Sequence, residues 1–200
     1  LMHGAEYDEM MEMVDSYRDK FESVAIAEPL LGEVGSDATV INADKEAVAK
    51  AITAAAVSEA GFESLEAAKD AGTAFVFMGH GTAHVAKVTY SQMQTQMQNL
   101  GYENVFIGTV EGEPEETSAE AVIEAVKAAG YTNVVLRPLM VVAGDHANND
   151  MAGSDDDSWK TVFEAAGFTV DCQIHGLGEI ADVQALYVAH TKAAIDALNA

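Results

Sequence analysis

Two histidines and one glutamate are the residues of this sequence best placed to do chemistry. His80, Glu111 and His146 each stand just past a run of apolar residues that the sequence predicts to be a β-strand. Two imidazoles and one carboxylate suit a divalent transition ion such as Co²⁺, Fe²⁺, Ni²⁺ or Zn²⁺, and three protein ligands leave coordination positions open. The glycines beside His80 and shortly before His146 let the backbone turn sharply. We therefore predict that the three residues form a metal site.

Simpler interpretations of the histidines stay open at this point. A single histidine in a loop is usually an ordinary polar residue whose hydrogen bonds are satisfied. His84 lies four residues after His80, where it is a second ligand, a support for His80 or a residue that faces solvent. His190 falls within a predicted helix and is expected to pack there or face solvent, whereas His3 and His175 have no assigned role.

The acidic run SDDDS at residues 154–158 has three interpretations. Ser154 or an aspartate can cap the N-terminus of the next helix, where acidic side chains also suit the helix dipole. The run can equally be an ordinary solvated loop. The functional interpretation is a lip that gathers cations beside the metal site.

The elements that must position these residues alternate between strand and helix. Strands are predicted at 74–78, 105–110, 133–142 and 168–174, and helices at 89–100, 115–129, 158–166 and 180–198. This alternation predicts an α/β fold, a doubly wound parallel four-stranded sheet with helices on both faces, from about residue 72 to the end of the chain. Ligands of such sheets bind beyond the carboxyl ends of the strands, which is where His80, Glu111 and His146 stand.

The first part of the chain is organised differently. Helical patterns cover 5–21, 43–60 and 62–70. Ser23–Ala27 (SVAIA) is the one good strand there, and a lone strand has unpaired edges and little stability of its own. We therefore expect this part to lack a complete sheet.

Charge and composition exclude several classes of protein. The 200 residues include 33 Asp and Glu against 10 Lys and Arg, for a formal net charge of −23, and 49% are hydrophobic. That apolar share excludes a disordered acidic tail, and the scarcity of basic side chains argues against nucleic-acid or anionic-membrane partners. A single cysteine, Cys172, excludes internal disulfides and cysteine-based zinc clusters. No segment approaches the roughly 20 apolar residues of a membrane span.

Several segments of the chain resemble one known family. They are FVFMGHGTAH (75–84), GTVEGEP (108–114), RPLMVVAGDHANNDMAGSDDDSW (137–159) and HGLGE (175–179), with GAEYDEM (4–10) and AEPLLG (27–32) nearer the N-terminus. They are similar to the class II chelatases, in particular to the anaerobic-type sirohydrochlorin cobaltochelatases of vitamin B12 biosynthesis. The resemblance runs through most of the chain, and the block at 137–159 is long and unusual in composition.

The resemblance implies a lyase that inserts Co²⁺, and in some members Fe²⁺ or Ni²⁺, into sirohydrochlorin. Two similar α/β domains of the family face each other across the cleft that holds the tetrapyrrole. The family's M-G-H-G, G-x-V-E and A-G-D-H motifs place its metal-binding and catalytic residues on His80, Glu111 and His146, the same set that the strand ends predict. Some periplasmic relatives also bind haem between subunits.

The start of the chain departs from the family pattern. The family begins with a strand and an S-F-G-T segment that would lie upstream of Leu1. Residues 1–70 therefore resemble the C-terminal part of an incomplete N-terminal α/β domain plus a linker helix, and residues 71–200 resemble the metal-binding domain. We expect either a longer native protein or a second chain, as in a homo-oligomer, that completes this half.

The expected function is that of a sirohydrochlorin cobaltochelatase that needs no ATP, and the alternative is a metal or tetrapyrrole carrier without turnover. Sirohydrochlorin is a polycarboxylate, so an acidic protein must bind it through backbone N–H groups at helix N-termini and a few basic side chains, with Arg137 and Lys87 as candidates. One member of the metal-binding trio, preferably a histidine, would accept the pyrrole protons. We expect a cytoplasmic protein, with the periplasm as the alternative.

Overall fold

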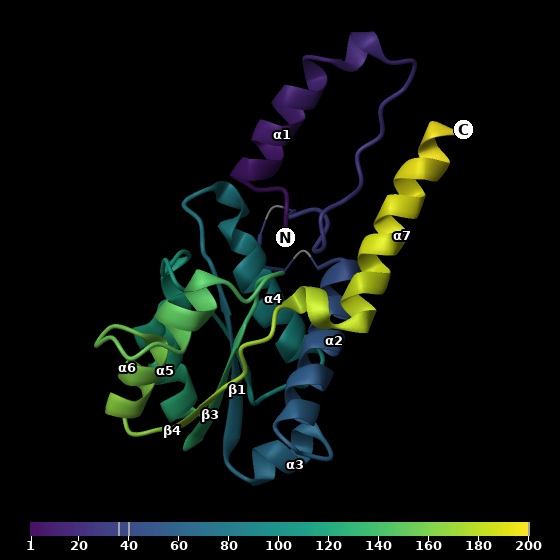
Figure 1. The fold of residues 1–200 in the computed structure, drawn as a ribbon. Helices are drawn as coiled ribbons and strands as arrows, with labels where there is room; N and C mark the ends of the chain where they lie inside the picture. The colour runs from purple at the N-terminus through teal and green to yellow at the C-terminus, as the bar shows by residue number, and fades with distance from the viewer. Residues whose placement is uncertain (36, 40, 200) are drawn as a thin grey trace.

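A parallel β-sheet forms the centre of the computed structural model, which describes residues 1–35, 37–39 and 41–199. Its strands are β1 (Thr73–Gly79), β2 (Val105–Thr109), β3 (Asn133–Pro138) and β4 (Thr169–Cys172). Within the described residues they form one four-stranded sheet in the order β2-β1-β3-β4, with every pair parallel (Figure 1). The predicted α/β class and its parallel sheet are therefore confirmed.

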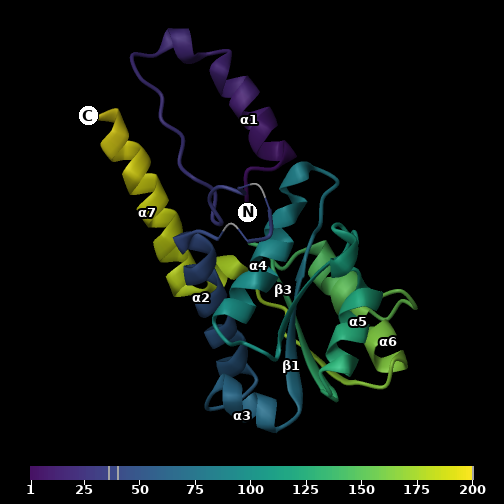
Figure 2. The same cartoon turned by 180° about the vertical axis from the view of Figure 1, so that it is seen from behind.

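Helices cover both faces of the sheet, as Figure 2 also shows from behind. The α-helices are α1 (Ala5–Asp15), α2 (Ala43–Glu59), α3 (Leu65–Asp70), α4 (Val88–Asn99), α5 (Ala119–Ala128), α6 (Trp159–Ala165) and α7 (Ala181–Leu198). Short helices are η1 (Arg18–Lys20), η2 (Val85–Lys87), η3 (Glu115–Thr117), η5 (Leu177–Glu179) and the π-helix η4 (Ala147–Met151).

The alternation of side chains along β1 builds two hydrophobic cores. Phe75 and Phe77 pack with residues of α2, α4 and α7 on one face, while Val76 and Met78 pack with residues of α5 and α6 on the other. All seven residues of β1 are buried. A strand buried on both faces reads as a continuous apolar run, which is why the sequence located β1 so closely.

Several predicted boundaries move for identifiable reasons. The strand predicted at 133–142 ends at Pro138, whose nitrogen has no hydrogen to donate to a ladder. The helix predicted at 115–129 is interrupted at Ser118, whose extended backbone and side chain cap α5. The helix predicted at 62–70 begins later, after Ser64, whose side chain accepts a hydrogen bond from the Ala67 N–H.

The strand predicted at Ser23–Ala27 is wrong. These residues adopt no regular structure, and no segment of the described chain pairs with them. Strand propensity alone does not make a strand, because each extended segment needs a neighbour for its backbone groups.

The helix predicted over 5–21 is shorter than expected. It ends at Asp15 in α1, and the 3₁₀-helix η1 follows after Tyr17. Every residue of α1 is at least partly exposed, and the apolar residues Tyr17 and Phe21 beyond it are 54% and 63% exposed. Figure 1 shows α1 standing away from the sheet. Its amphipathic pattern thus has little to pack against within the described chain.

The helix α2 shares the core of the sheet although it precedes residue 71. Val48, Ile52 and Ala56 of α2 belong to the same buried cluster as Phe75 and Phe77 of β1. The division of the chain at residue 70 stays a prediction, and so does the assignment of the first part as a remnant of a second domain.

A buried lysine fastens the segment before α2 to the helix. Lys45 is fully buried, and its Nζ donates hydrogen bonds to the carbonyls of Leu31 (2.9 Å) and Glu33 (2.6 Å). Asn42 caps α2 by accepting from the Lys45 N–H, and its amide donates to the Leu31 carbonyl. Burial lowers the pKa of Lys45 to about 8.

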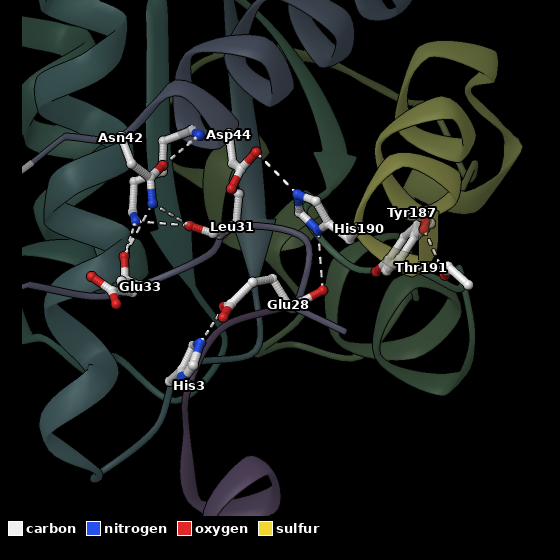
Figure 3. A network of polar contacts seen from close by, with 10 residues as sticks. His3, Glu28, Leu31, Glu33, Asn42, Asp44, Tyr187, His190 and Thr191 are labelled. Carbon is white, nitrogen blue, oxygen red and sulfur yellow. Dashed lines mark hydrogen bonds and ion pairs between the residues drawn. The ribbon is translucent and has the colours of Figure 1, made fainter. Parts of the chain in front are cut away.

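Histidines add two further connections in this region, shown in Figure 3. His190 of α7 contacts the Glu28 carbonyl through Nδ1 (3.0 Å) and the Asp44 carboxylate through Nε2 (3.1 Å). His3 contacts the Glu28 carboxylate at 2.6 Å and packs on the Tyr7 ring. These contacts connect the N-terminal segment to α2 and α7. Among the described residues, none of the helices has the length and apolar content required to cross a membrane.

We predict that Lys45 makes the protein's stability rise with pH in alkaline solution. The folded-state pKa of about 8 lies below the roughly 10.4 of an exposed lysine, so between those values the unfolded chain binds more protons. The free energy of unfolding of the wild type should therefore rise relative to Lys45→Met, by about 1.4 kcal/mol per pH unit in that window. Urea unfolding at pH 7.5, 9 and 10 measures it.

The control is Lys50→Met on the same helix. Lys50 is exposed, and its hydrogen bond to Glu46 raises rather than lowers its pKa. Its difference from the wild type should not grow between pH 8 and 10. Parallel stability curves for the wild type and Lys45→Met would contradict the prediction.

Candidate metal centre

The pairing of β1 with β2 continues past the ends of both strands and brings Glu111 beside His80. The Val110 N–H donates to the Gly79 carbonyl, and the Glu111 N–H donates to the His80 carbonyl, each at 2.9 Å. These hydrogen bonds hold together the backbones of His80, one residue beyond β1, and Glu111, two residues beyond β2. The parallel register of β1 and β2 therefore brings these two residues to the same edge of the sheet, as predicted.

His80 and His146 lie on either side of the point where the winding of the sheet reverses. The neighbouring strands β1 and β3 lead into α4 and α6, which pack on opposite faces. Ligands of doubly wound sheets bind in the crevice at such a point. The two imidazole rings lie 4.6 Å apart between centroids, at 82° to one another. The structure thus brings together two residues that are 66 positions apart in the chain.

Each of the two imidazoles is hydrogen-bonded through Nδ1. The His80 Nδ1 lies 3.0 Å from the Gly81 carbonyl oxygen, and the His146 Nδ1 lies 2.6 Å from Oδ2 of Asp150. His146 is the residue that precedes η4, and Asp150 lies within it. Single π-helical turns of this kind are frequent at functional sites.

Glu111 lines an acidic cavity next to the histidines. Asp150, Asp157 and Glu120 line the same cavity, together with Trp159. Because Asp150 is bonded to His146, this cavity adjoins the pair of imidazoles. Within residues 1–35, 37–39 and 41–199, however, no three His, Cys, Asp or Glu side chains are gathered so that they could hold a metal ion. The two histidines meet, and the complete set of three ligands stays a prediction.

His80 lines a second cavity, which is also lined by a residue that sequence reasoning missed. Glu6 of α1 lines it with His80 and Tyr90. The Tyr90 hydroxyl accepts a hydrogen bond from the Gly81 N–H at 3.1 Å, and burial raises the pKa of Tyr90. The sequence assigns the helix that contains Glu6 to another domain, so it does not predict that Glu6 lies near His80. The one sequence feature that could have indicated a role for Glu6 is the segment GAEYDEM (4–10), which resembles the chelatase family.

The remaining candidate histidines have structural partners. The His84 ring accepts a hydrogen bond from the Ala86 N–H at Nδ1 (3.1 Å), and its Nε2 reaches Asp8 of α1 (3.2 Å). It therefore supports the loop after β1 rather than pointing at the other imidazoles. His175 lies between the carboxylates of Glu179 (2.8 Å) and Glu59 (3.4 Å).

The two basic candidates for substrate carboxylates behave differently. Arg137 is 4% exposed and is held by Glu59 (2.6 Å) and by Gln173 (2.8 Å), so it is a structural residue. Lys87 follows the His80 loop, where it pairs with Glu113 at 2.7 Å and is 40% exposed. Of the two, Lys87 is the one that a ligand can reach.

The acidic run is a solvated loop, its cap is not the predicted one, and its cation-gathering role stays a prediction. Ser158, rather than Ser154, caps α6 by accepting a hydrogen bond from the Thr161 N–H. Asp155, Asp156 and Asp157 are all exposed to solvent, and Asp157 also lines the cavity that Glu111 lines.

Comparison with known proteins gives consistent matches along the chain. The protein-family model described as "Cobalt chelatase (CbiK)" matches residues 1–196. The chain is 32% identical over 196 residues to the "Sirohydrochlorin cobaltochelatase" of Salmonella typhimurium. The aligned region covers 98% of this chain and 66% of that protein. It is 31% identical over 201 residues to the "Sirohydrochlorin cobaltochelatase CbiKC" of Nitratidesulfovibrio vulgaris, covering 100% of this chain and 64% of that protein. The chain thus spans about two thirds of the length of these curated relatives.

We predict that a methyl group at Gly81 disrupts the metal centre. Gly81 has φ +93°, and a Cβ there would lie 2.8 Å from the Glu111 Cβ. Gly81→Ala should therefore displace Glu111 from His80 and lower Co²⁺ affinity at least about tenfold, the order seen when groups that orient metal ligands are lost. Calorimetric titration with Co²⁺ measures the affinity.

Gly130→Ala is the matched control. Gly130 also has a left-handed backbone, φ +86°, but a Cβ there would meet nothing within 4 Å. Both variants carry the same backbone strain of about 1–2 kcal/mol, so Gly130→Ala should lose stability and keep its Co²⁺ affinity. Equal Co²⁺ affinities in the two variants would contradict the assignment of this loop to the metal centre.

Proposed function

The chain belongs to the cobalt chelatase (CbiK) family, and from that premise we propose that it inserts Co²⁺ into sirohydrochlorin without ATP, as a step of cobalamin biosynthesis. The observation that supports this most is the meeting of His80 and His146 at the reversal point of the sheet, with Glu111 anchored beside His80. Because the chain spans about two thirds of its relatives, the activity is a proposal for the whole protein to which this chain corresponds.

The metal enters as a substrate held by the trio. His80, His146 and Glu111 would bind Co²⁺ and leave coordination positions for the incoming pyrrole nitrogens. Fe²⁺, Ni²⁺ and Zn²⁺ fit the same donor set, so we propose that supply and geometry, rather than affinity, select cobalt. No residue is assigned to haem.

Insertion also needs a base for two pyrrole protons. A histidine that donates its lone pair to cobalt cannot take a proton at the same nitrogen, so a base outside the metal-bound atoms is favoured. Glu6 lines the same cavity as His80 and supplies a carboxylate that belongs to none of the three ligands. We therefore propose Glu6, rather than one of the histidines, as the base.

Co²⁺ and sirohydrochlorin carry opposite charges, so we propose that different side chains bind them. Asp157 and Glu120 line the cavity beside Glu111, so the acidic surface would concentrate Co²⁺ where the ligands lie. Sirohydrochlorin carries carboxylates and must avoid those groups. Lys87 and the backbone N–H groups of the loops after β1 are the groups proposed to meet them.

The proposal also covers the protein's assembly and its location in the cell. We propose that a longer native chain or a second copy in a homo-oligomer covers the exposed apolar residues of the N-terminal segment, among them Tyr17 and Phe21. We propose a cytoplasmic location, with the periplasm as the alternative.

The proposal predicts that His80→Ala and His146→Ala each reduce cobalt insertion to the spontaneous background. Removing either imidazole leaves too few ligands to hold Co²⁺ during insertion. The measurement is an anaerobic absorbance assay with sirohydrochlorin and Co²⁺. His175→Gln, which removes an imidazole bonded to Glu59 and Glu179 rather than one of the proposed ligands, is the control and should retain activity.

Two outcomes would contradict the proposal. Insertion at the wild-type rate in His146→Ala would remove this residue from the site. Binding of both Co²⁺ and sirohydrochlorin by the wild type, without conversion above background, would instead identify a carrier.

A further inference from the structure

The two imidazoles of the metal centre are hydrogen-bonded at the same ring nitrogen, and both partners are acceptors. The Gly81 carbonyl oxygen faces Nδ1 of His80, and the Asp150 carboxylate faces Nδ1 of His146. A carbonyl oxygen and an ionised carboxylate can accept a hydrogen bond but cannot donate one. Each Nδ1 must therefore carry the proton.

From this geometry we propose that Asp150 and the Gly81 carbonyl are positioning groups, which hold His146 and His80 in the Nδ1–H tautomer so that both Nε2 lone pairs are ready for a metal ion. The inference rests on the proposed function for the identity of the metal. Within the described chain, neither Nε2 has a hydrogen-bond partner. Histidines that bind metals commonly donate their other N–H to a carboxylate or carbonyl in this way.

His84 shows that the tautomer is set by the partner. This ring lies in the same loop as His80, yet its Nδ1 accepts from the Ala86 N–H, so a neutral His84 carries its proton on Nε2. That proton faces Asp8. One loop thus holds two imidazoles in opposite tautomers, and the one with a free Nε2 is the one that adjoins His146.

The π-helical turn η4 places the Asp150 carboxylate beside the His146 ring. The two residues are four positions apart, with Asp150 inside the π-helical turn that follows His146, so their side chains lie on the same side of the turn. The neighbouring carboxylate, Asp145, is taken by the side-chain amide of Asn149 at 2.6 Å. Asp145 therefore does not compete with Asp150 for the imidazole.

Asp150→Asn tests the inference, because an asparagine of the same shape can donate its amide hydrogen to Nδ1. A donor there should move the proton of His146 to Nε2, as an aspartate-to-asparagine change does beside the histidine of serine proteases. Nitrogen-15 NMR of the metal-free protein, at alkaline pH where each imidazole carries one proton, reports which nitrogen is protonated. We expect Nδ1–H in the wild type and Nε2–H in Asp150→Asn. Co²⁺ affinity should fall about 10- to 100-fold.

Asp157→Asn is the matched control. Asp157 lines the same acidic cavity, and its replacement removes the same charge without touching His146. It should keep the wild-type tautomer and lose less Co²⁺ affinity than Asp150→Asn. Asp150→Glu, which restores an acceptor, should recover the Nδ1–H tautomer.

The inference is overturned by an unchanged His146 tautomer in Asp150→Asn, or by equal losses of Co²⁺ affinity in Asp150→Asn and Asp157→Asn. Neither readout uses sirohydrochlorin. A wild-type protein that shows the expected tautomer and Co²⁺ affinity but no insertion would overturn the proposed function and support the positioning role.

Discussion

The site depends on the parallel pairing of β1 with both of its neighbours. Because the register with β2 runs on past the strand ends, the Glu111 N–H reaches the His80 carbonyl. Because β3 pairs in parallel with the other side of β1, the loop that carries His146 leaves the sheet at the same edge. The buried strand β1 therefore has two roles. Its side chains fill two hydrophobic cores, and its carboxyl end fixes the distance between residues far apart in the chain.

Two cavities with different linings lie beside the candidate site. The cavity that Glu111 lines is acidic and suits a cation, whereas the cavity that His80 lines is bordered by apolar residues with Glu6 and Tyr90. The contact between His84 and Asp8 holds α1 to the loop after β1 and so keeps Glu6 near His80. A net charge of −23 is thus compatible with an anionic substrate, provided the carboxylates of that substrate lie away from the acidic cavity.

Sequence reasoning located what depends on local pattern and missed what depends on tertiary contacts. The strand β1 was found because burial on both faces produces a continuous apolar run. The proximity of His80 and His146 was predicted because the loops after neighbouring parallel strands share one edge of the sheet. The strand predicted at Ser23–Ala27 was wrong because strand propensity does not show whether a neighbouring strand is available for pairing. The approach of Glu6 and the bond from His146 to Asp150 depend on how α1 and a π-helical turn are placed, which no periodicity in the sequence encodes.

A crystal structure of the cobalt-loaded protein, with anomalous scattering recorded at the cobalt absorption edge, tests the central claim most directly. The account predicts one dominant cobalt peak within bonding distance of Nε2 of His80 and Nε2 of His146, with the Glu111 carboxylate turned toward it. A dominant peak in the acidic cavity of Glu120 and Asp157, coordinated by carboxylates without either imidazole, would contradict it.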